Sequence, residues 1–252
     1  MVEFSIVIPA FNEEAGITSS LTQVINFMRG FSNGFEVIVV DDGSTDKTAE
    51  KVENHLKEYP QIKLIKNPHK GKAFSTRTGV LMASGKYVLM SDADMATPIS
   101  ELKRLFIWMQ DHGFEVVVGS REGIGAKRAN EPLTRHIMGR VFNMIVRVLT
   151  GLDIQDTQCG FKLFKGEAAQ EIFNRLLVFG SEVEETEKPR VSAFDVEILL
   201  VAKKLGYKIK EVPISWTYVP TRRVHPVRDS ILNFLDVVKI KANDILGKYS
   251  KY

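Results

Sequence analysis

Hydrophobic and polar positions in the first half of the chain follow two alternating patterns. Short, continuous apolar runs that end in turns are typical of buried strands, and they cover residues 4–9, 35–40, 62–65 and 87–90. Between these runs apolar residues recur at every third or fourth position, which predicts helices at about 13–29, 45–56 and 71–83. Such alternation forms βαβ units, so we expect an α/β fold with a mostly parallel central sheet flanked by helices.

The second half of the chain is patterned less regularly. Helices are expected at 101–110, 133–149, 194–205 and 230–246, and strands at 114–119, around 163–164 and at 208–216. The acidic, polar segment 181–190 has no core pattern, and we expect it to be a mobile loop. Because neither an internal repeat nor a linker is visible, we expect residues 1–252 to form one domain.

Composition narrows the class of protein. The 252 residues are 44% hydrophobic and 26% charged, which excludes a disordered or fibrous chain. A net charge of only +3 gives no argument for a nucleic-acid partner. Cys159 is the single cysteine, so an intrachain disulfide and a cysteine metal cluster are excluded, and a reducing, cytoplasmic setting is expected.

Two further patterns concern membranes and phosphates. No signal peptide is expected, and no apolar run approaches the roughly 18–20 residues of a spanning helix. We therefore expect a soluble protein, or one that lies on a membrane without crossing it. Positive charge gathers locally in residues 121–147, which suits phosphates or anionic lipid better than a polynucleotide groove.

The most informative polar positions are Asp92 and Asp94, which follow the apolar run 87–90. Residues two apart on an extended chain point the same way, and open α/β sheets bind ligands at the carboxyl ends of their strands. Two carboxylates aimed together suit Mg²⁺ or Mn²⁺ held jointly with substrate phosphates. The pair therefore predicts a metal–diphosphate site.

Other polar groups follow the neighbouring predicted strands. Asp41 and Asp42 end the second strand and can accept hydrogen bonds from a base or a ribose. Lys70 and Lys72 flank Gly71 and can neutralise a diphosphate. Pro9, Phe11, Asn12 and Glu13 follow the first strand at the same edge.

Each of these positions also has a purely structural interpretation. Asn12 and Glu13 can cap the first helix, the aspartates at 41 and 42 can belong to a plain turn, and the lysines to a flexible basic loop. Cys159 is expected to be a packed side chain, since nothing marks its thiolate as stabilised. Asp195 either orients a substrate or caps the helix at 194–205.

The motifs taken together resemble a known family. Pro-Ala-Phe-Asn-Glu at 9–13, Asp-Asp-Gly-Ser-Thr-Asp at 41–46, the Lys-Gly-Lys-Ala stretch at 70–73 and Asp-Ala-Asp at 92–94 resemble the family 2 glycosyltransferases, which have a GT-A fold. The later stretches resemble the polyprenyl-phosphate glycosyltransferases, most of all the dolichyl-phosphate β-glucosyltransferases; they are 119–121, 156–164, 193–197 and 211–216. Dolichyl-phosphate mannose synthases share most of these motifs.

The resemblance implies an inverting enzyme that moves glucose from UDP-glucose to a dolichyl or other polyprenyl phosphate with Mg²⁺ or Mn²⁺. It implies a nucleotide-sugar-binding half at 1–121 and an acceptor-binding half at 122–252. Asp92 and Asp94 would hold the metal. The donor would contact Pro9, Phe11, Asn12, Glu13, Asp41, Asp42, Lys70, Lys72, Asp92 and Ala93. The acceptor phosphate would contact Arg121, Arg128, Arg135, Arg222 and Arg223, and the catalytic set would be Asp94, Arg121, Arg135 and Asp195.

Three alternatives stay open at this point. One is a mannose synthase that uses GDP-mannose, although those enzymes often carry a metal-binding glutamine where this chain has Ala96. Another is a non-catalytic nucleotide-sugar-binding protein. The third is a transferase acting on a hydroxyl acceptor, which would need a carboxylate base, and Asp195 is the candidate.

The helices expected at 133–149 and 230–246 combine a broad apolar stripe with cations, which is typical of helices that lie in a membrane interface. The alternative is that each stripe packs on the sheet. With a lipid acceptor, we expect a peripheral protein on the cytoplasmic face of a membrane, held there by its helices, by a membrane partner or by homo-oligomerisation.

Overall fold

The structure is a computed structural model that describes residues 2–181, 192–220 and 226–250. Its central sheet has seven strands in the order β3-β2-β1-β4-β7-β5-β8. Their bounds are β1 Phe4–Ala10, β2 Phe35–Asp41, β3 Ile62–Lys66, β4 Tyr87–Met90, β5 Val116–Ser120, β7 Lys162–Lys165 and β8 Ile209–Pro213. Only β7 runs antiparallel to its neighbours, so the expectation of a mostly parallel sheet is confirmed.

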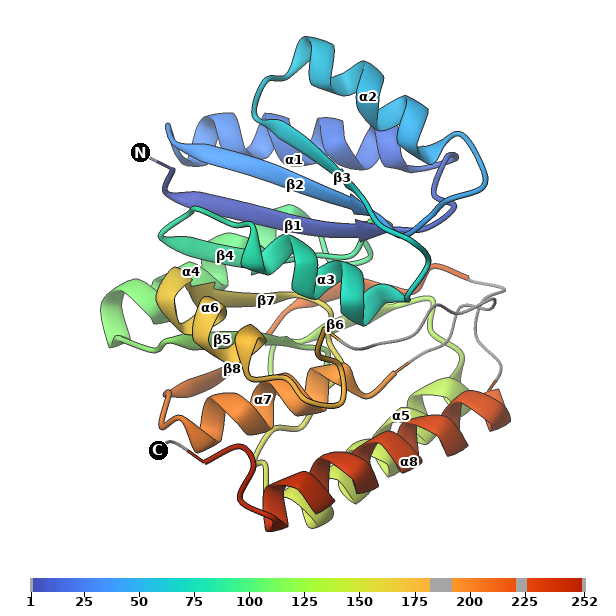
Figure 1. The fold of residues 1–252 in the computed structure, drawn as a ribbon, viewed down its shortest axis with the longest axis vertical. Helices are drawn as coiled ribbons and strands as arrows, with labels where there is room; N and C mark the ends of the chain where they lie inside the picture. Colours follow the sequence, from blue (N-terminus) through green and yellow to red (C-terminus); the bar gives the residue numbers. More distant parts are fainter. Residues whose placement is uncertain (1, 182–191, 221–225, 251–252) are drawn as a thin grey trace.

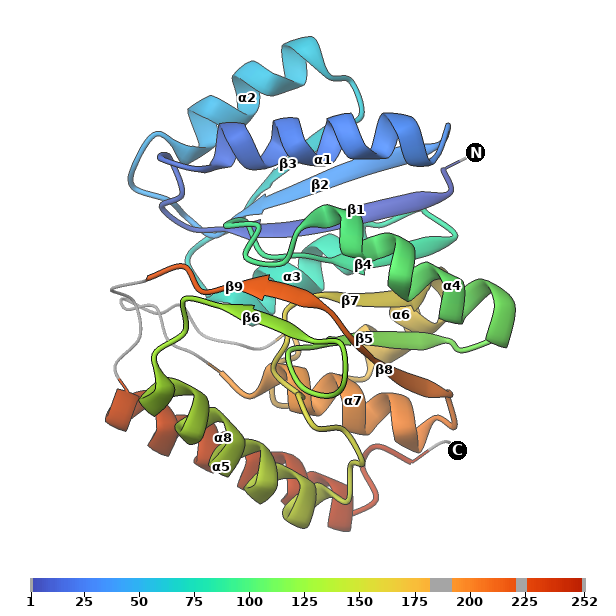
Figure 2. The same ribbon diagram turned by 180° about the vertical axis from the view of Figure 1, so that it is seen from behind.

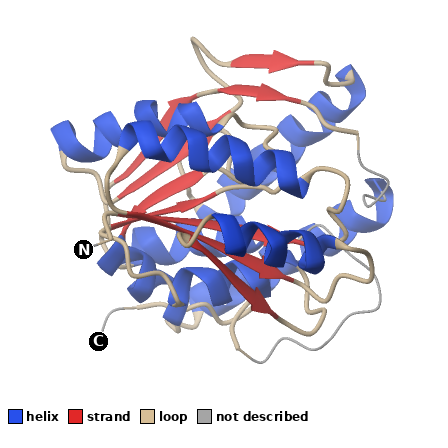
Figure 3. Cartoon of the chain, turned by 90° about the horizontal axis from the view of Figure 1, so that it is seen from above, coloured by secondary structure: helices blue, strands red, loops and turns tan. Residues whose placement is uncertain are grey.

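Helices cover both faces of this sheet (Figures 1 and 2). Their bounds are α1 Ile17–Phe31, α2 Thr48–Glu58, α3 Lys72–Leu81, α4 Leu102–His112, α5 Leu133–Thr150, α6 Gly166–Asn174, α7 Phe194–Lys204 and α8 Pro226–Ile245. Helices α3, α6 and α7 pack on one face, and α1 and α4 on the other. Figure 3 shows the twist of the sheet between these two layers.

Strands β1, β2 and β4 are apolar at almost every position because both of their faces are buried. In β1, Val7 joins the core under α3 and α6, whereas Ile6 and Ile8 join the core under α1 and α4. The same alternation places Val88 and Leu89 of β4 on opposite faces. These two apolar cores hold the sheet in register, and that register fixes where the loops after each strand emerge.

Strands β1, β2 and β4 end at one edge of the sheet. Ala10 at the end of β1 pairs with Asp41 at the end of β2, and Val7 pairs with Met90 at the end of β4. The polar loops that follow these strands are therefore brought together, as the sequence analysis predicted for parallel strands.

The strand expected at 208–216 is in fact two strands that belong to different sheets. Strand β8 ends at Pro213, and β9 (Ser215–Thr217) pairs in parallel with β6 (Lys127–Ala129). The apolar pattern did not predict β6, because its three residues are Lys-Arg-Ala and have no buried face. Pro213 has no N–H to donate, which favours the end of the main ladder at this point.

Helices α5 and α8 lie side by side at the end of the molecule farthest from β3 (Figure 1). Along α5, Leu133, Met144 and Val148 are 72%, 61% and 80% exposed. The large exposed apolar residues of α8 are Ile231, Phe234, Leu235, Val238 and Ile245. Both stripes are therefore only partly used for packing. Within the described residues, no helix has the length and apolar character needed to cross a bilayer.

Candidate active site

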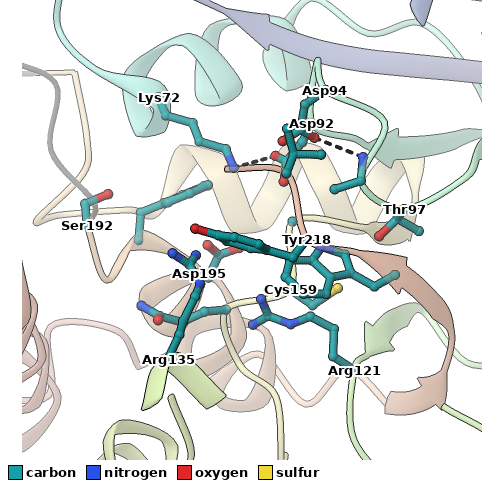
Figure 4. A pocket seen from close by; sticks show the side chains of 16 residues that line it. Lys72, Asp92, Asp94, Thr97, Arg121, Arg135, Cys159, Ser192, Asp195 and Tyr218 are labelled. Carbon is teal, nitrogen blue, oxygen red and sulfur yellow. Dashed lines mark hydrogen bonds and ion pairs between the residues drawn. The ribbon is translucent and has the colours of Figure 1, made fainter. Parts of the chain in front are cut away.

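A cavity of about 260 Å³ opens at the carboxyl edge of β4 (Figure 4). Its lining residues come from both halves of the sequence: Lys72, Asp92, Asp94, Ala96, Thr97, Arg121, Arg135, Gln158, Cys159, Gly160, Ser192, Phe194, Asp195, Trp216, Tyr218 and Val219. Figure 4 shows Lys72, Asp92 and Asp94 on one side of the cavity and Arg121 and Arg135 on the opposite side. The cavity thus has a mixed wall of carboxylates and a lysine that faces a wall of arginines.

Asp92 and Asp94 occupy this first wall, as predicted from their position after β4. Burial opposes ionisation of Asp92, but its ion pair with Lys72 lowers the pKa of the carboxyl below the usual value. Partial desolvation in the cavity and then the charge of Asp92 raise the pKa of Asp94. Asp94 Oδ1 accepts a hydrogen bond from the Ala96 backbone N–H at 3.0 Å. Burial and the neighbouring charge of Asp92 therefore disfavour the ionised form of Asp94, and the protein does not fully compensate for this.

This arrangement fits a divalent cation held partly by its substrate. Among the described residues, no group of three or more His, Cys, Asp or Glu side chains is placed to hold a metal. The protein would supply the carboxylates of Asp94 and Asp92, and Mg²⁺ or Mn²⁺ commonly takes one or two carboxylates together with substrate phosphates. The raised pKa of Asp94 also means that a nearby cation would relieve its repulsion with Asp92.

Asp41 and Asp42 follow β2, and the structure separates their tasks. Asp41 is buried, its Oδ2 accepts from the Ser44 N–H at 3.3 Å, and its Oδ1 has no hydrogen-bond partner among the described residues. Asp42 accepts the backbone N–H groups of Lys70 and Gly71 and so anchors the basic loop. Asp41 therefore keeps an acceptor for a ligand, whereas Asp42 shapes the loop.

The aromatic ring of Phe11 stacks on His69, with centroids 4.1 Å apart and planes at 6°. His69 Nδ1 lies 2.7 Å from Asp42 Oδ2. The stacked rings therefore join the loops after β1 and β3, and the aspartate joins the loops after β2 and β3. The sequence analysis placed Phe11 and Asp42 at one edge, and the structure brings them together. The stacking of Phe11 on His69 was not predicted, since an aromatic contact between loops leaves no periodic signal in the sequence.

The other predicted donor-side residues lie in the same loops. Asn12 has φ of +51° and its Oδ1 accepts from the Thr45 N–H at 2.8 Å. The Glu13 N–H donates to Thr48 Oγ1 at 2.7 Å, which ties this loop to α2. Pro9 lies within β1, and the Ala93 carbonyl accepts from Ser20 Oγ at 2.6 Å. The Lys70 ammonium lies over the Phe74 ring, whereas Lys72 points into the cavity.

Arg121 is held in a fixed orientation by Asp156. Its Nε and Nη2 donate to Asp156 Oδ2 and Oδ1 at 2.7 and 2.8 Å, and its backbone N–H donates to Oδ2 at 2.9 Å. The indole of Trp216 lies against the guanidinium, with the Arg121 Cζ 5.2 Å from the ring centroid. Burial alone would raise the pKa of the fully buried Asp156 carboxyl, but Arg121 lowers it. The two-point contact aims the free edge of the guanidinium, Nη1, away from this pair.

The remaining predicted arginines differ in how fully their charge is neutralised. Arg128 forms ion pairs with Glu122 and Glu131 and donates to the Arg121 carbonyl, so carboxylates already neutralise it. Arg135 Cζ lies 5.0 Å from the centroid of the Tyr218 ring, and Arg135 Nε lies 3.9 Å from Glu131 Oε1. The charge of Arg135 is therefore far less compensated than that of Arg128. The predicted residues Arg222 and Arg223 lie outside the described residues.

Asp195 lines the cavity, but its carboxylate is paired with the buried Lys162. Lys162 also donates to the carbonyl of Cys159. The Asp195 carboxylate is thus already engaged by a buried lysine, which gives no support to the hydroxyl-acceptor alternative. Burial raises the pKa of the Cys159 thiol to about 12, in agreement with its predicted role as a packed side chain.

Sequence reasoning missed several groups of this site. No role was predicted for Asp156, Lys162, Trp216 or Tyr218, because a single charge or ring carries no spacing signal. A Cβ added at Gly160 would lie 2.5 Å from Asp92 Oδ2, so this motif glycine permits the close approach of the carboxylate. The division into a donor half and an acceptor half stays a prediction.

A second cavity of about 430 Å³ adjoins the first and lies between α5 and α8. Its apolar lining includes Pro132, Met138 and Phe142, and its polar lining includes Asn143, Asp229 and Asn233. Arg121, Arg135, Gln158 and Tyr218 line both cavities. The two cavities therefore meet at a shared wall.

A family model and known relatives both match most of this chain. The family model "Glycosyl transferase family 2" matches residues 5–173. A dolichyl-phosphate β-glucosyltransferase of Dictyostelium discoideum is 35% identical over 98% of this chain and 76% of its own length. The enzyme of the same name from Saccharomyces cerevisiae is 33% identical over 97% of this chain and 76% of its own length.

Solved structures resemble the fold at lower identity. Glucosyl-3-phosphoglycerate synthase from Mycobacterium tuberculosis, in complex with Mn²⁺, UDP-glucose and phosphoglyceric acid, superposes with a TM-score of 0.61 at 19% identity. The match covers 96% of this chain and 80% of that one. Mannosyltransferase PcManGT from Pyrobaculum calidifontis, in complex with GDP-Man and Mn²⁺, superposes with a TM-score of 0.60 at 19% identity. This match covers 94% of this chain and 64% of that one. These likenesses support the predicted GT-A fold.

Proposed function

This chain belongs to glycosyl transferase family 2 and, within it, to the dolichyl-phosphate β-glucosyltransferases, and from that premise we propose that it transfers glucose from UDP-glucose to a dolichyl or related polyprenyl phosphate. The observation that carries the proposal is the composition of the first cavity. Its Asp92–Asp94 wall suits a cation with a diphosphate, and its opposite wall presents two arginines, Arg121 and Arg135.

The chemistry needs little proton transfer. A phosphate monoester is already anionic at neutral pH, so its oxygen can attack the anomeric carbon of the sugar without a strong base. The bond from that carbon to the UDP oxygen breaks, and the configuration is inverted. What the site must supply is positive charge that holds two phosphate groups close together, and Lys72, Arg121 and Arg135 provide it.

A divalent cation completes the donor side of the proposal. Mg²⁺ or Mn²⁺ bound at Asp94, with Asp92, would stabilise the charge that develops on the departing diphosphate. The Asp41 Oδ1 acceptor would receive a hydrogen bond from the nucleotide, and Phe11 would lie beside it. Ala96 supplies only its backbone N–H to Asp94, so no side-chain amide is added to the cation site there.

The direct test is acceptor-dependent release of nucleoside diphosphate, with UDP-glucose and GDP-mannose presented separately in Mn²⁺ with a short polyprenyl phosphate. We expect release from UDP-glucose and formation of a glucosyl phosphoprenol. Release from GDP-mannose alone would assign the protein to the mannose-transferring relatives instead. Tight nucleotide binding without turnover of either donor would support a non-catalytic role.

We further propose that α5 and α8 rest on the cytoplasmic surface of a membrane. Both helices carry exposed apolar residues and also line the second cavity, and that cavity leads to the shared wall where a lipid phosphate would react. Arg140 and Arg147 on α5 suit anionic headgroups. A lipid substrate therefore need not leave the bilayer completely to reach Arg135.

Co-sedimentation with vesicles of phosphatidylcholine and phosphatidylserine tests this placement. We expect the double variant Met144→Asp, Val148→Asp to bind vesicles about tenfold more weakly, because it places two charges on exposed apolar positions of α5. Met82→Asp is the matched control, since Met82 is 62% exposed but lies beyond α3, away from α5 and α8. Equal binding by the wild type and the double variant would rule out α5 as a membrane contact.

A further inference from the structure

Gln158 places one polar atom of its side chain, the amide nitrogen, in an unusual position. Its Nε2 is buried and has no hydrogen-bond partner among the described residues. The side chain lines both cavities, as do Arg121, Arg135 and Tyr218. A buried amide donor left unpaired is costly to the folded protein, so its presence at a cavity junction points to a ligand that accepts from it.

The backbone on both sides of Gln158 is fixed by neighbouring contacts. The preceding residue, Thr157, donates through its N–H and hydroxyl to Asn143 Oδ1 at 3.1 and 2.7 Å. The following residue, Cys159, is buried and its carbonyl accepts from Lys162. The carboxamide is therefore presented from a rigid loop rather than from a mobile one, which lowers the entropic cost of binding.

The shared wall favours one class of ligand chemistry. Arg121 and Arg135 can only donate hydrogen bonds, and the unpaired atom of Gln158 is also a donor. A sugar hydroxyl would be met by a mixture of donors and acceptors, whereas a phosphate offers only acceptor oxygens at neutral pH. The carboxylates that suit the cation and the donor diphosphate line the first cavity but not the second.

We propose that Gln158 Nε2 donates a hydrogen bond to the phosphate of the lipid acceptor, at the junction of the two cavities, which Arg121 and Arg135 also line. The inference rests on the proposed function, because it takes the second cavity as the entry for a prenyl phosphate. Gln158 is then an acceptor-binding residue: it adds a neutral, directional donor between two cations and holds the phosphate for attack.

Two substitutions test this contact. Gln158→Leu removes the donor at nearly constant volume, and Gln158→Glu keeps the shape but places a negative charge against the phosphate. Gln155→Leu is the matched control, because Gln155 lies in the same loop and is exposed. Each purified variant is titrated calorimetrically with farnesyl phosphate, farnesol and inorganic phosphate without donor, and its acceptor and UDP-glucose KM values are then measured.

We expect Gln158→Leu to raise the Kd for farnesyl phosphate about tenfold, in line with loss of a hydrogen bond to a charged group. Gln158→Glu should raise it further, and Gln155→Leu should leave it unchanged. Farnesol should bind all proteins alike, and the UDP-glucose KM should stay within twofold of wild type. Weaker binding of inorganic phosphate by the variants would identify the phosphate itself as the recognised group.

Two results would overturn the inference: farnesyl phosphate affinity within twofold of wild type in Gln158→Leu, or a loss confined to UDP-glucose. A thermal unfolding curve like that of wild type shows that a variant is folded, and Gln158→Glu serves if the leucine variant is not. If wild type binds farnesyl phosphate through Gln158 but transfers no glucose, the proposed function fails while this contact stands. If glucose transfer proceeds normally in both variants, the contact fails while the function stands.

Discussion

The substitution Asp94→Asn is expected to lower the rate of acceptor-dependent UDP release by at least about 100-fold. This is the scale seen when one stabilising group is removed from a transition state. Asparagine keeps the shape of the side chain and its contact with the Ala96 N–H, but it removes the charge that would hold Mg²⁺ or Mn²⁺. The measurement is the initial rate at saturating UDP-glucose over a Mn²⁺ titration. The half-saturating Mn²⁺ concentration should rise together with the loss of rate.

The stability of this variant gives an independent check. Because Asp92 raises the pKa of Asp94, the two carboxylates repel each other in the metal-free protein. Asp94→Asn should therefore melt at the same temperature as wild type or slightly higher, in spite of its inactivity. Asp111→Asn is the control, since this exposed residue at the end of α4 is far from the cavity. A variant at position 94 that retains more than a tenth of the rate would show that this carboxylate is not needed for transfer.

Replacement of Asp156 by asparagine is expected to destabilise the fold by about 3 kcal/mol, because it leaves the guanidinium of Arg121 without its buried counter-charge. Activity should fall as well, since Arg121 loses the two-point contact that orients it toward the cavity. The free energy of unfolding is measured by urea denaturation at neutral pH, and the acceptor KM by initial rates. The exposed pair Arg147–Asp153 is the control: Asp153→Asn should cost about 1 kcal/mol or less.

The difference in the free energy of unfolding between wild type and Asp156→Asn should depend on pH with a definite sign. Arg121 lowers the pKa of Asp156 in the folded protein below its unfolded value. The carboxylate therefore contributes its full stabilisation above the unfolded pKa, about 4, and loses it as the pH falls through the lowered folded value. The gap between wild type and Asp156→Asn should be constant from pH 6 to pH 8 and shrink only in acid. A gap that stays the same down to pH 3 would mean that the pair does not carry the effect.

The local pattern of the chain was sufficient to predict the strands β1, β2 and β4, a mostly parallel sheet, and the polar edge at which these strands end. Continuous apolar runs in β1, β2 and β4 indicated strands buried on both faces, and parallel strands must end at one edge. The placement of Asp41, Asp92 and Asp94 at one edge of the sheet followed from those two facts. The antiparallel direction of β7 and the small β6–β9 sheet were not predictable in this way. Strand β7 has only two apolar residues and β6 only one, and so short a pattern does not reveal the direction of a strand or its partner.

The arginines near the cavity show most clearly what the sequence could not predict. The sequence predicted Arg121, Arg128 and Arg135 together as contacts of the acceptor phosphate. In the structure Asp156 orients the first, Glu122 and Glu131 neutralise the second, and the third lies over Tyr218. Their partners lie up to 83 residues away along the chain in the case of Tyr218, which no periodicity can relate to Arg135.

By itself, the sequence determined the α/β class, the family, the carboxylate pair after β4 and the single packed cysteine, because each depends on residues that are close together along the chain. The tertiary structure alone decided which arginines line the first cavity, that Asp195 is paired with Lys162, and that Gln158 lies where the two cavities meet. The physical reason is that charge neutralisation and burial are set by neighbours in space, and packing of the two apolar cores chooses those neighbours.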